Sequence, residues 1–159
     1  MARVLICPKC RTLITDDTRS RKHDGCFHAF LGYCFQSWPA ESTFHPKDKE
    51  QLRSWCLWRT GHTATPMTWN FSSERERKAL VPFVAAMMLH FARMGVYVWA
   101  QENDASIELV QAESINWERV GERKFMEISE DVTAFIKEFA GIDFQTWKEM
   151  ETQRRRDVA

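Results

Sequence analysis

The sequence predicts an α+β fold, a mostly helical single domain with a small antiparallel sheet and an N-terminal hairpin. Three observations predict this fold. The chain of 159 residues is long enough for one domain with its own core. Apolar residues make up 44% of it, and seven Trp and eleven Phe supply large core side chains. Helical spacing of apolar residues covers most of the chain, whereas short strand-like stretches occur in two places.

The first strand-like stretches lie at the N-terminus. Residues 4–6 and 12–14 are rich in Val, Leu and Ile, and they flank the C-x-x-C knuckle of Cys7 and Cys10. The Pro8-Lys9 pair between the two cysteines is typical of a turn. We therefore expect a hairpin that carries the knuckle.

Two helices are predicted to follow this hairpin. Apolar spacing becomes helical near residue 20, and Pro39 ends the first helix. Pro46 begins the second helix, for which Gly61 is a suitable C-terminal cap.

A third, long apolar helix is predicted to begin at a capping box. Ser73 suits the N-cap position and Glu76 the third helical position, and Gly95 follows the last apolar turn. Pro82 inside this helix is expected to kink or split it.

The C-terminal part combines a second hairpin with two further helices. Residues 96–99 and 107–110 are expected to pair around a polar turn. The clearest helix runs from Phe125 to Phe139 and ends at Gly141, and a short last helix begins at Asp143. We expect one domain over residues 1–159, a zinc-stapled hairpin-helix over 1–38 and a flexible basic tail over 152–159.

The 3–4 spacing on several helices also predicts the core. The residues expected in it are Phe27, Leu31, Phe35, Leu52, Val84, Met88, Phe125, Ile128, Val132 and Phe135.

Net charge is zero, but the charges are spread unevenly along the chain. Residues 1–62 carry ten Lys/Arg against six Asp/Glu, and residues 95–153 carry five against thirteen. This distribution predicts a basic N-terminal face with an acidic back, or ordinary solvated charge. No signal peptide or membrane span is expected, so we predict a cytoplasmic protein in which five cysteines are thiols or metal ligands.

Four cysteine and histidine residues have the spacing of a zinc site. Cys7, Cys10, His23 and Cys26 form the pattern C-x2-C-x12-H-x2-C. A hairpin turn can present the first two, and a helix places His23 and Cys26 on one face. His28 lies roughly 200° around the helix from Cys26 and cannot easily join them. We therefore predict one structural Zn²⁺, because tetrahedral zinc takes four such ligands.

Other interpretations of these residues remain open. Cys26 and Cys34 are ordinary core residues in one of them, since free Cys is often buried. His23 then caps the helix or contacts a phosphate. A redox C-x-x-C is a weaker alternative, because no thioredoxin-like β-α-β pattern surrounds it.

Several segments resemble, in the same order, motifs of a family of small phage and prophage proteins of unknown function, typically encoded near replication and recombination genes. They are RSRKH (19–23) with Phe27, Phe30, Leu31 and FQSW (35–38), then LRSW (52–55), RTGH (59–62) and ESINWERV (113–120). The resemblance covers about two thirds of the chain. His23 belongs to the family pattern, whereas the cysteines at 7, 10 and 26 do not, and residues 63–95 fit it poorly.

The opening of the same region is loosely similar to NinB-type recombination proteins, which bind single-stranded DNA. Here His23 and Asp24 stand where those proteins have Gln and Asn. Both resemblances imply a role beside DNA replication or recombination.

A binding protein rather than an enzyme is predicted. The sequence has no nucleophile motif and no phosphate-cradling glycine loop. Asp16 and Asp17 with Asp24 could bind a divalent metal as in a nuclease, but adjacent carboxylates in a loop are more often solvated. The residues expected to contact single-stranded or branched DNA are Arg19, Arg21, Lys22, Arg53, Arg59 and His62, with Trp58 or Trp38 available for stacking on bases.

The rival prediction is a phage protein that binds a host protein, such as a defence nuclease, and inhibits or redirects it. The acidic segment 95–153 would engage a basic host surface, and the apolar helix over 79–94 would build a homo-oligomer. The salt dependence of binding distinguishes the two predictions. The affinity for DNA falls steeply as salt rises, whereas the affinity of an apolar protein interface changes less.

Overall fold

The computed structural model describes residues 5–6, 13–14, 21–115 and 120–158. The structure has two compact units. We call Met1–Leu52 with Ser114–Ala159 the helical unit, and Arg53–Glu113 the sheet unit. The α+β class, mostly helical with a small antiparallel sheet, is confirmed.

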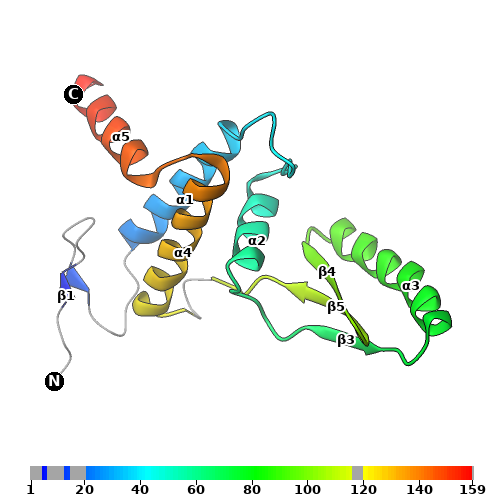
Figure 1. The fold of residues 1–159 in the computed structure, drawn as a ribbon. Coiled ribbons are helices and arrows are strands. Elements are labelled where there is room, and N and C mark those ends of the chain that lie inside the picture. Colours follow the sequence, from blue (N-terminus) through cyan, green and yellow to red (C-terminus); the bar gives the residue numbers. More distant parts are fainter. Residues whose placement is uncertain (1–4, 7–12, 15–20, 116–119, 159) are drawn as a thin grey trace. The chain divides into compact units, whose positions relative to one another are not determined.

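The helical unit contains strands β1 (Leu5–Ile6) and β2 (Leu13–Ile14), which pair antiparallel, and helices α1 (Arg21–Gln36), α4 (Glu122–Ala140) and α5 (Phe144–Val158) (Figure 1). The knuckle expected between the two strands lies outside the described residues. Helix α2 (Lys49–Arg59) begins in the helical unit and ends in the sheet unit.

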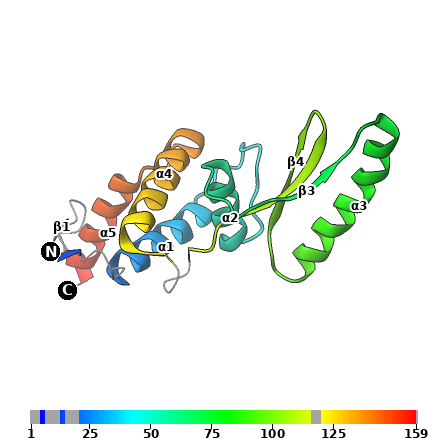
Figure 2. The ribbon, with the colours of Figure 1, turned by 90° about the horizontal axis from the view of Figure 1, so that it is seen from below.

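Aromatic side chains join the three helices of the helical unit. Phe27 of α1 meets Phe125 of α4 edge-on, with ring centroids 5.5 Å apart, and α1 and α4 lie side by side in both ribbon views (Figures 1 and 2). Phe30 of α1 packs against Phe144 and Trp147 of α5 at 5.0 and 5.4 Å. Such pairs add specific geometry to the burial of large apolar areas.

Helix α4 buries one side, as its sequence predicts. Phe125, Ile128, Val132 and Ile136 are almost completely buried at 3–4 spacing. The helix ends at Gly141, whose φ of 70° is left-handed and suits glycine.

The sheet unit contains strands β3 (Met67–Asn70), β4 (Val98–Asn103) and β5 (Ser106–Gln111), and helix α3 (Glu74–Arg93). The strand order is β3-β5-β4 and both pairings are antiparallel, so β5 is central. Helix α3 covers one face of this sheet (Figure 2).

The core of the sheet unit lies between α3 and the sheet. Val84 of α3 packs there with Val98, Ile107 and Leu109 of the strands. Half-buried side chains surround this cluster, namely Trp69, Phe71, Leu80, Met87, Met88, Phe91 and Val96.

The predicted cap of α3 is confirmed, with one change. Ser73 is the N-cap, and its hydroxyl accepts a hydrogen bond from the backbone N–H of Glu76 at 3.2 Å. The carboxylate of Glu76 accepts from the N–H and hydroxyl of Ser72 at 2.7 and 2.8 Å. The helix continues through Pro82 without the predicted split, and Gly95 follows its end with a φ of 74°.

Most of the predicted core is confirmed, with three exceptions. Phe35, Met88 and Phe135 are half-buried, whereas the other seven residues are buried. Strand β3 was not predicted, and the turn of the second hairpin lies at Asp104 and Ala105.

The C-terminal helix is longer than predicted. Helix α5 extends to Val158, so residues 152–158 are helical where a flexible tail was expected. None of the helices in the described part of the chain is long and apolar enough to cross a membrane.

Candidate functional site

The predicted DNA-contacting residues fall in both units. Arg19 lies outside the described residues, and of Arg21 only the backbone, at the start of α1, is described. Lys22 is exposed in the first turn of α1. Arg53, Arg59 and His62 belong to the sheet unit, where their surroundings differ.

Two tryptophans stack where α2 ends, and a third lies one turn earlier on the same helix; we call Trp55, Trp58 and Trp99 the tryptophan cluster. Trp58 of α2 and Trp99 of β4 stack nearly parallel, with centroids 5.2 Å apart and an interplanar angle of 7°. The indole N–H of Trp99 donates to the hydroxyl of the buried Ser54 at 3.2 Å. Trp58 and Trp99 are half-buried, so each retains some surface.

The guanidinium group of Arg59 lies beside this cluster. Its guanidinium carbon lies 5.8 Å from the ring centroid of Trp55 and 5.9 Å from that of Trp58. These distances are within the range of a cation–π contact. Trp55 and Arg59 are four residues apart and therefore share a side of α2. The arrangement presents an exposed cation next to stacked aromatic rings.

His62 is placed differently, because it is only 6% exposed. Its backbone N–H donates to the carbonyl of Leu57, and its carbonyl accepts from the N–H of Glu113, both at 2.9 Å. Gly61 before it has a φ of 81°. The imidazole of His62 therefore offers little surface to a phosphate. Arg53 is half-buried on α2.

His23, the predicted zinc ligand, has a buried carboxylate partner. Its Nδ1 is hydrogen-bonded to the carboxylate of Glu122 in the first turn of α4. The side chain of His23 is 11% exposed and that of Glu122 is completely buried. A carboxylate on one ring nitrogen is how proteins orient metal-binding histidines, and it equally satisfies a buried polar pair.

Of the other three predicted zinc ligands, only Cys26 is among the described residues. Cys26 is half-buried one turn after His23, as its spacing predicts. Cys7 and Cys10 lie outside the described residues. Among the residues that the structure does describe, no three His, Cys, Asp or Glu side chains gather as a metal site.

The other acidic and thiol candidates are also placed. Asp24 lies 3.5 Å from Nε2 of His28, one turn along α1. Asp16 and Asp17 fall outside the described residues. Cys34 and Cys56 are buried, and burial raises the pKa of the Cys34 thiol to about 12. Cys34 is therefore a neutral core residue at physiological pH.

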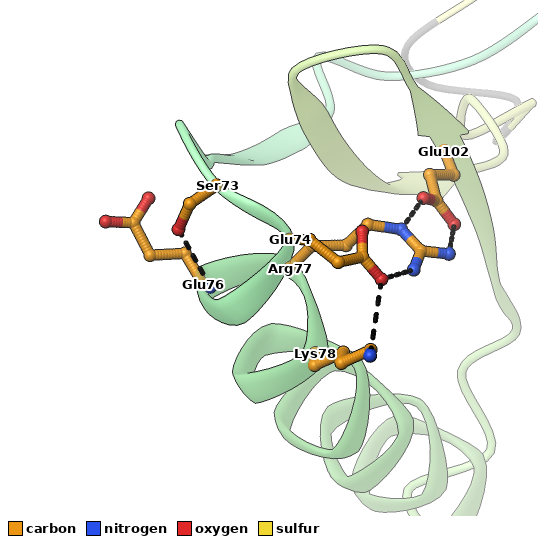
Figure 3. A network of polar contacts seen from close by, with 6 residues as sticks. All are labelled: Ser73, Glu74, Glu76, Arg77, Lys78 and Glu102. Atoms are coloured by element: carbon orange, nitrogen blue, oxygen red, sulfur yellow. Dashed lines mark hydrogen bonds and ion pairs between the residues drawn. The ribbon is translucent and has the colours of Figure 1, made fainter.

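A polar network that sequence reasoning did not predict connects α3 to β4 (Figure 3). Arg77 forms a forked ion pair with the carboxylate of Glu102 and a second contact with Glu74 at 2.9 Å. Lys78 approaches Glu74 at 3.9 Å. The hydrogen bond from Arg77 lowers the pKa of Glu102, and the same contact raises the pKa of Arg77.

This network borders an open hollow beside the first turn of α3, which also includes Ser72, Asn103 and Asp104. Carboxylates outnumber cations in the hollow, and Arg77 is already engaged by two of them. The network therefore connects the helix to the strand. The hollow beside it does not suit an anion.

Comparisons with known proteins give no family assignment. No family model matches the chain, and neither a curated protein nor a solved structure matches it.

Proposed function

We propose that this chain is a non-enzymatic DNA-binding protein, a phage-encoded accessory factor of replication or recombination in the cytoplasm of the bacterial host. It binds single-stranded or branched DNA. The observation that carries the proposal is the exposed Arg59 beside the tryptophan cluster. The resemblance of RSRKH and the later segments to phage proteins supplies the biological context.

The chemistry of Arg59 and the tryptophan cluster suits a nucleic-acid strand. A guanidinium can hold a phosphate bidentately while its plane remains near an aromatic ring. The stack of Trp58 and Trp99 offers a half-buried aromatic surface, and stacking of a base on such a surface contributes about 1–3 kcal/mol. Arg19, Arg21, Lys22 and Arg53 supply the positive charge expected to track the phosphate backbone.

Salt titrations of DNA binding test this proposal. Fluorescence anisotropy with a labelled 30-nucleotide strand and a four-way junction compares the wild type with Arg59→Ala and with Arg19→Ala/Arg21→Ala. Each lost phosphate contact should reduce the slope of log K against log salt by about one unit.

The matched control is Arg123→Ala, which removes an exposed arginine from α4. Equal losses for Arg59→Ala and Arg123→Ala would show general electrostatic attraction rather than a site. The proposal fails if the wild type binds neither DNA at micromolar concentration and low salt.

We further propose that Cys7, Cys10, His23 and Cys26 hold one structural Zn²⁺, with an N-terminal hairpin carrying the first two. The spacing of the four residues supports this, as does the buried Glu122 on Nδ1 of His23. Elemental analysis of protein purified without chelator should give about one zinc per chain, and chelator should lower the unfolding temperature. Less than ~0.2 zinc per chain, with no effect of chelator, would contradict the proposal.

A second candidate function is binding of a host protein. The exposed apolar side chains of α3, among them Phe83 and Leu89, favour it, because exposed apolar surface marks interaction sites. Capture from host lysate at low and high salt tests this candidate, which predicts a partner retained at high salt.

A further inference from the structure

The side of α3 that faces away from the sheet is unusually apolar. In a helix with 3.6 residues per turn, the residues on the side opposite the buried Val84 are all exposed. We call this the outer face of α3, and it consists of Arg75, Ala79, Pro82, Ala86, Leu89 and Arg93.

Larger apolar side chains border the outer face. Leu89 within it is 54% exposed, and Phe83 beside it is 46% exposed. Ala79 and Ala86 leave shallow spaces between these larger residues, because their side chains end at Cβ. A bulky apolar side chain from another molecule fits such spaces, as ridges fit grooves between packed helices.

Both ends of the outer face are cationic. Arg75 and Arg93 are exposed, and neither forms an ion pair with any carboxylate in the described parts of the chain. Their Cα atoms are about 27 Å apart along the helix at a rise of 1.5 Å per residue. A cation in the first turn opposes the helix dipole, so helix stability does not account for Arg75.

We propose that the outer face of α3 binds an acidic amphipathic helix of a partner protein. Bulky apolar residues of that helix pack over Ala79, Pro82 and Ala86, and its carboxylates reach Arg75 and Arg93. This deepens the second candidate function, because it gives the chemistry of the partner and the surface that meets it.

Charge argues against two other occupants. In an antiparallel pair of two copies, Arg93 of each would approach Arg75 of the other, because both arginines lie on the outer face. In a lipid surface, Arg75 and Arg93 would enter to the same depth as the apolar residues between them. Alanine and proline would also contribute little to insertion there.

Selection from a displayed library of 20-residue helical peptides, with varied apolar and charged positions, tests the proposal on the full chain. Enriched peptides should be acidic and carry an apolar stripe. Their affinity should fall about tenfold or more for Ala86→Glu and for Arg75→Glu/Arg93→Glu. The charge-matched control Arg123→Glu/Lys124→Glu, on exposed positions of α4, should bind them unchanged.

Three outcomes overturn the inference. In the first, acidic amphipathic peptides are not enriched. In the second, Ala86→Glu binds the peptides as well as the wild type does, while circular dichroism shows that it is folded. In the third, the outer face binds a second copy of the chain or a lipid surface instead. The last is measured as self-association in sedimentation, or as binding to anionic phospholipid vesicles, that Ala86→Glu abolishes. Peptides that require the outer face, with no host protein captured, would support the inference and contradict the second candidate function.

Discussion

Helices α3 and α4 have nearly equal lengths, 20 and 19 residues, but they bury their apolar side chains in different ways. Helix α4 hides an apolar stripe, and exposed carboxylates such as Glu127 and Glu130 lie on its outside. In α3, all of which is described, Val84 is the only buried residue.

The two helices differ in how much of their apolar surface other elements cover. Such a helix is usually covered all round, yet α3 has a three-stranded sheet on one face and an exposed apolar face opposite it. The one-sided apolar pattern of α4 is buried within its own unit, whereas the apolar pattern of α3, which extends to several sides, leaves apolar surface exposed.

The largest expected difference between the two helices comes from truncating a phenylalanine in each. Phe125→Ala should cost about 3–5 kcal/mol in the free energy of unfolding, because this α4 side chain is 1% exposed. Phe83→Ala in α3 should cost about 1 kcal/mol or less, because that ring is nearly half exposed. Urea titrations measure both, and equal losses would contradict the comparison.

The first turns of the two helices should also differ. Glu122→Ala in α4 should cost about 1–3 kcal/mol, because it leaves the imidazole of His23 without its carboxylate in a nearly buried position. In chelator-treated protein, where His23 holds no metal, His23→Leu/Glu122→Leu should recover most of the loss measured for the single variants His23→Leu and Glu122→Leu, because both polar groups are then removed. A double-mutant cycle in urea checks this, and strictly additive losses would show that the pair does not interact.

The corresponding anchor of α3 is exposed and should be weaker. Glu102→Gln should destabilise the protein less than Glu122→Ala, because water screens the ion pair with Arg77. Arg77 lowers the pKa of Glu102, so this contact stabilises the fold above the usual carboxyl pKa and is lost as pH falls through the lowered one. A loss equal to that of Glu122→Ala in urea at pH 7 would refute this ranking.

A smaller effect is expected at the end of α4, where Asp143 begins α5. Hydrogen bonds from Lys137 and from the N–H of Thr146 lower the pKa of Asp143 to about 2. The lowered pKa stabilises the folded state above about pH 4, and this contribution disappears as pH falls from 4 towards 2. Asp143→Asn should therefore unfold with a shallower acid dependence in that window, as followed by circular dichroism. An unchanged acid dependence would exclude this role.

The smallest expected effect concerns reactivity rather than stability. The Cys34 thiol is buried and its pKa is about 12, so a maleimide should not label it in the native protein at pH 7. Labelling should appear in urea, and mass spectrometry of peptides identifies the residue. Native labelling of Cys34 as fast as in urea would show that α1 opens readily.

The sequence by itself determined the features that depend on neighbouring residues. Ser73 was predicted to begin α3 and Gly141 to end α4, because caps are decided within one turn. The stripe of Phe125, Ile128 and Val132 likewise predicted which side of α4 is buried.

Only the tertiary structure decided the features that join distant segments. Strand β3 is four residues long and is recognisable through its pairing with β5, about 40 residues later. Glu122 meets His23 across 99 residues, and no local pattern announces that contact. Periodicity shows that α3 is apolar on several sides, but how many of those sides are covered depends on the layers that the rest of the chain supplies.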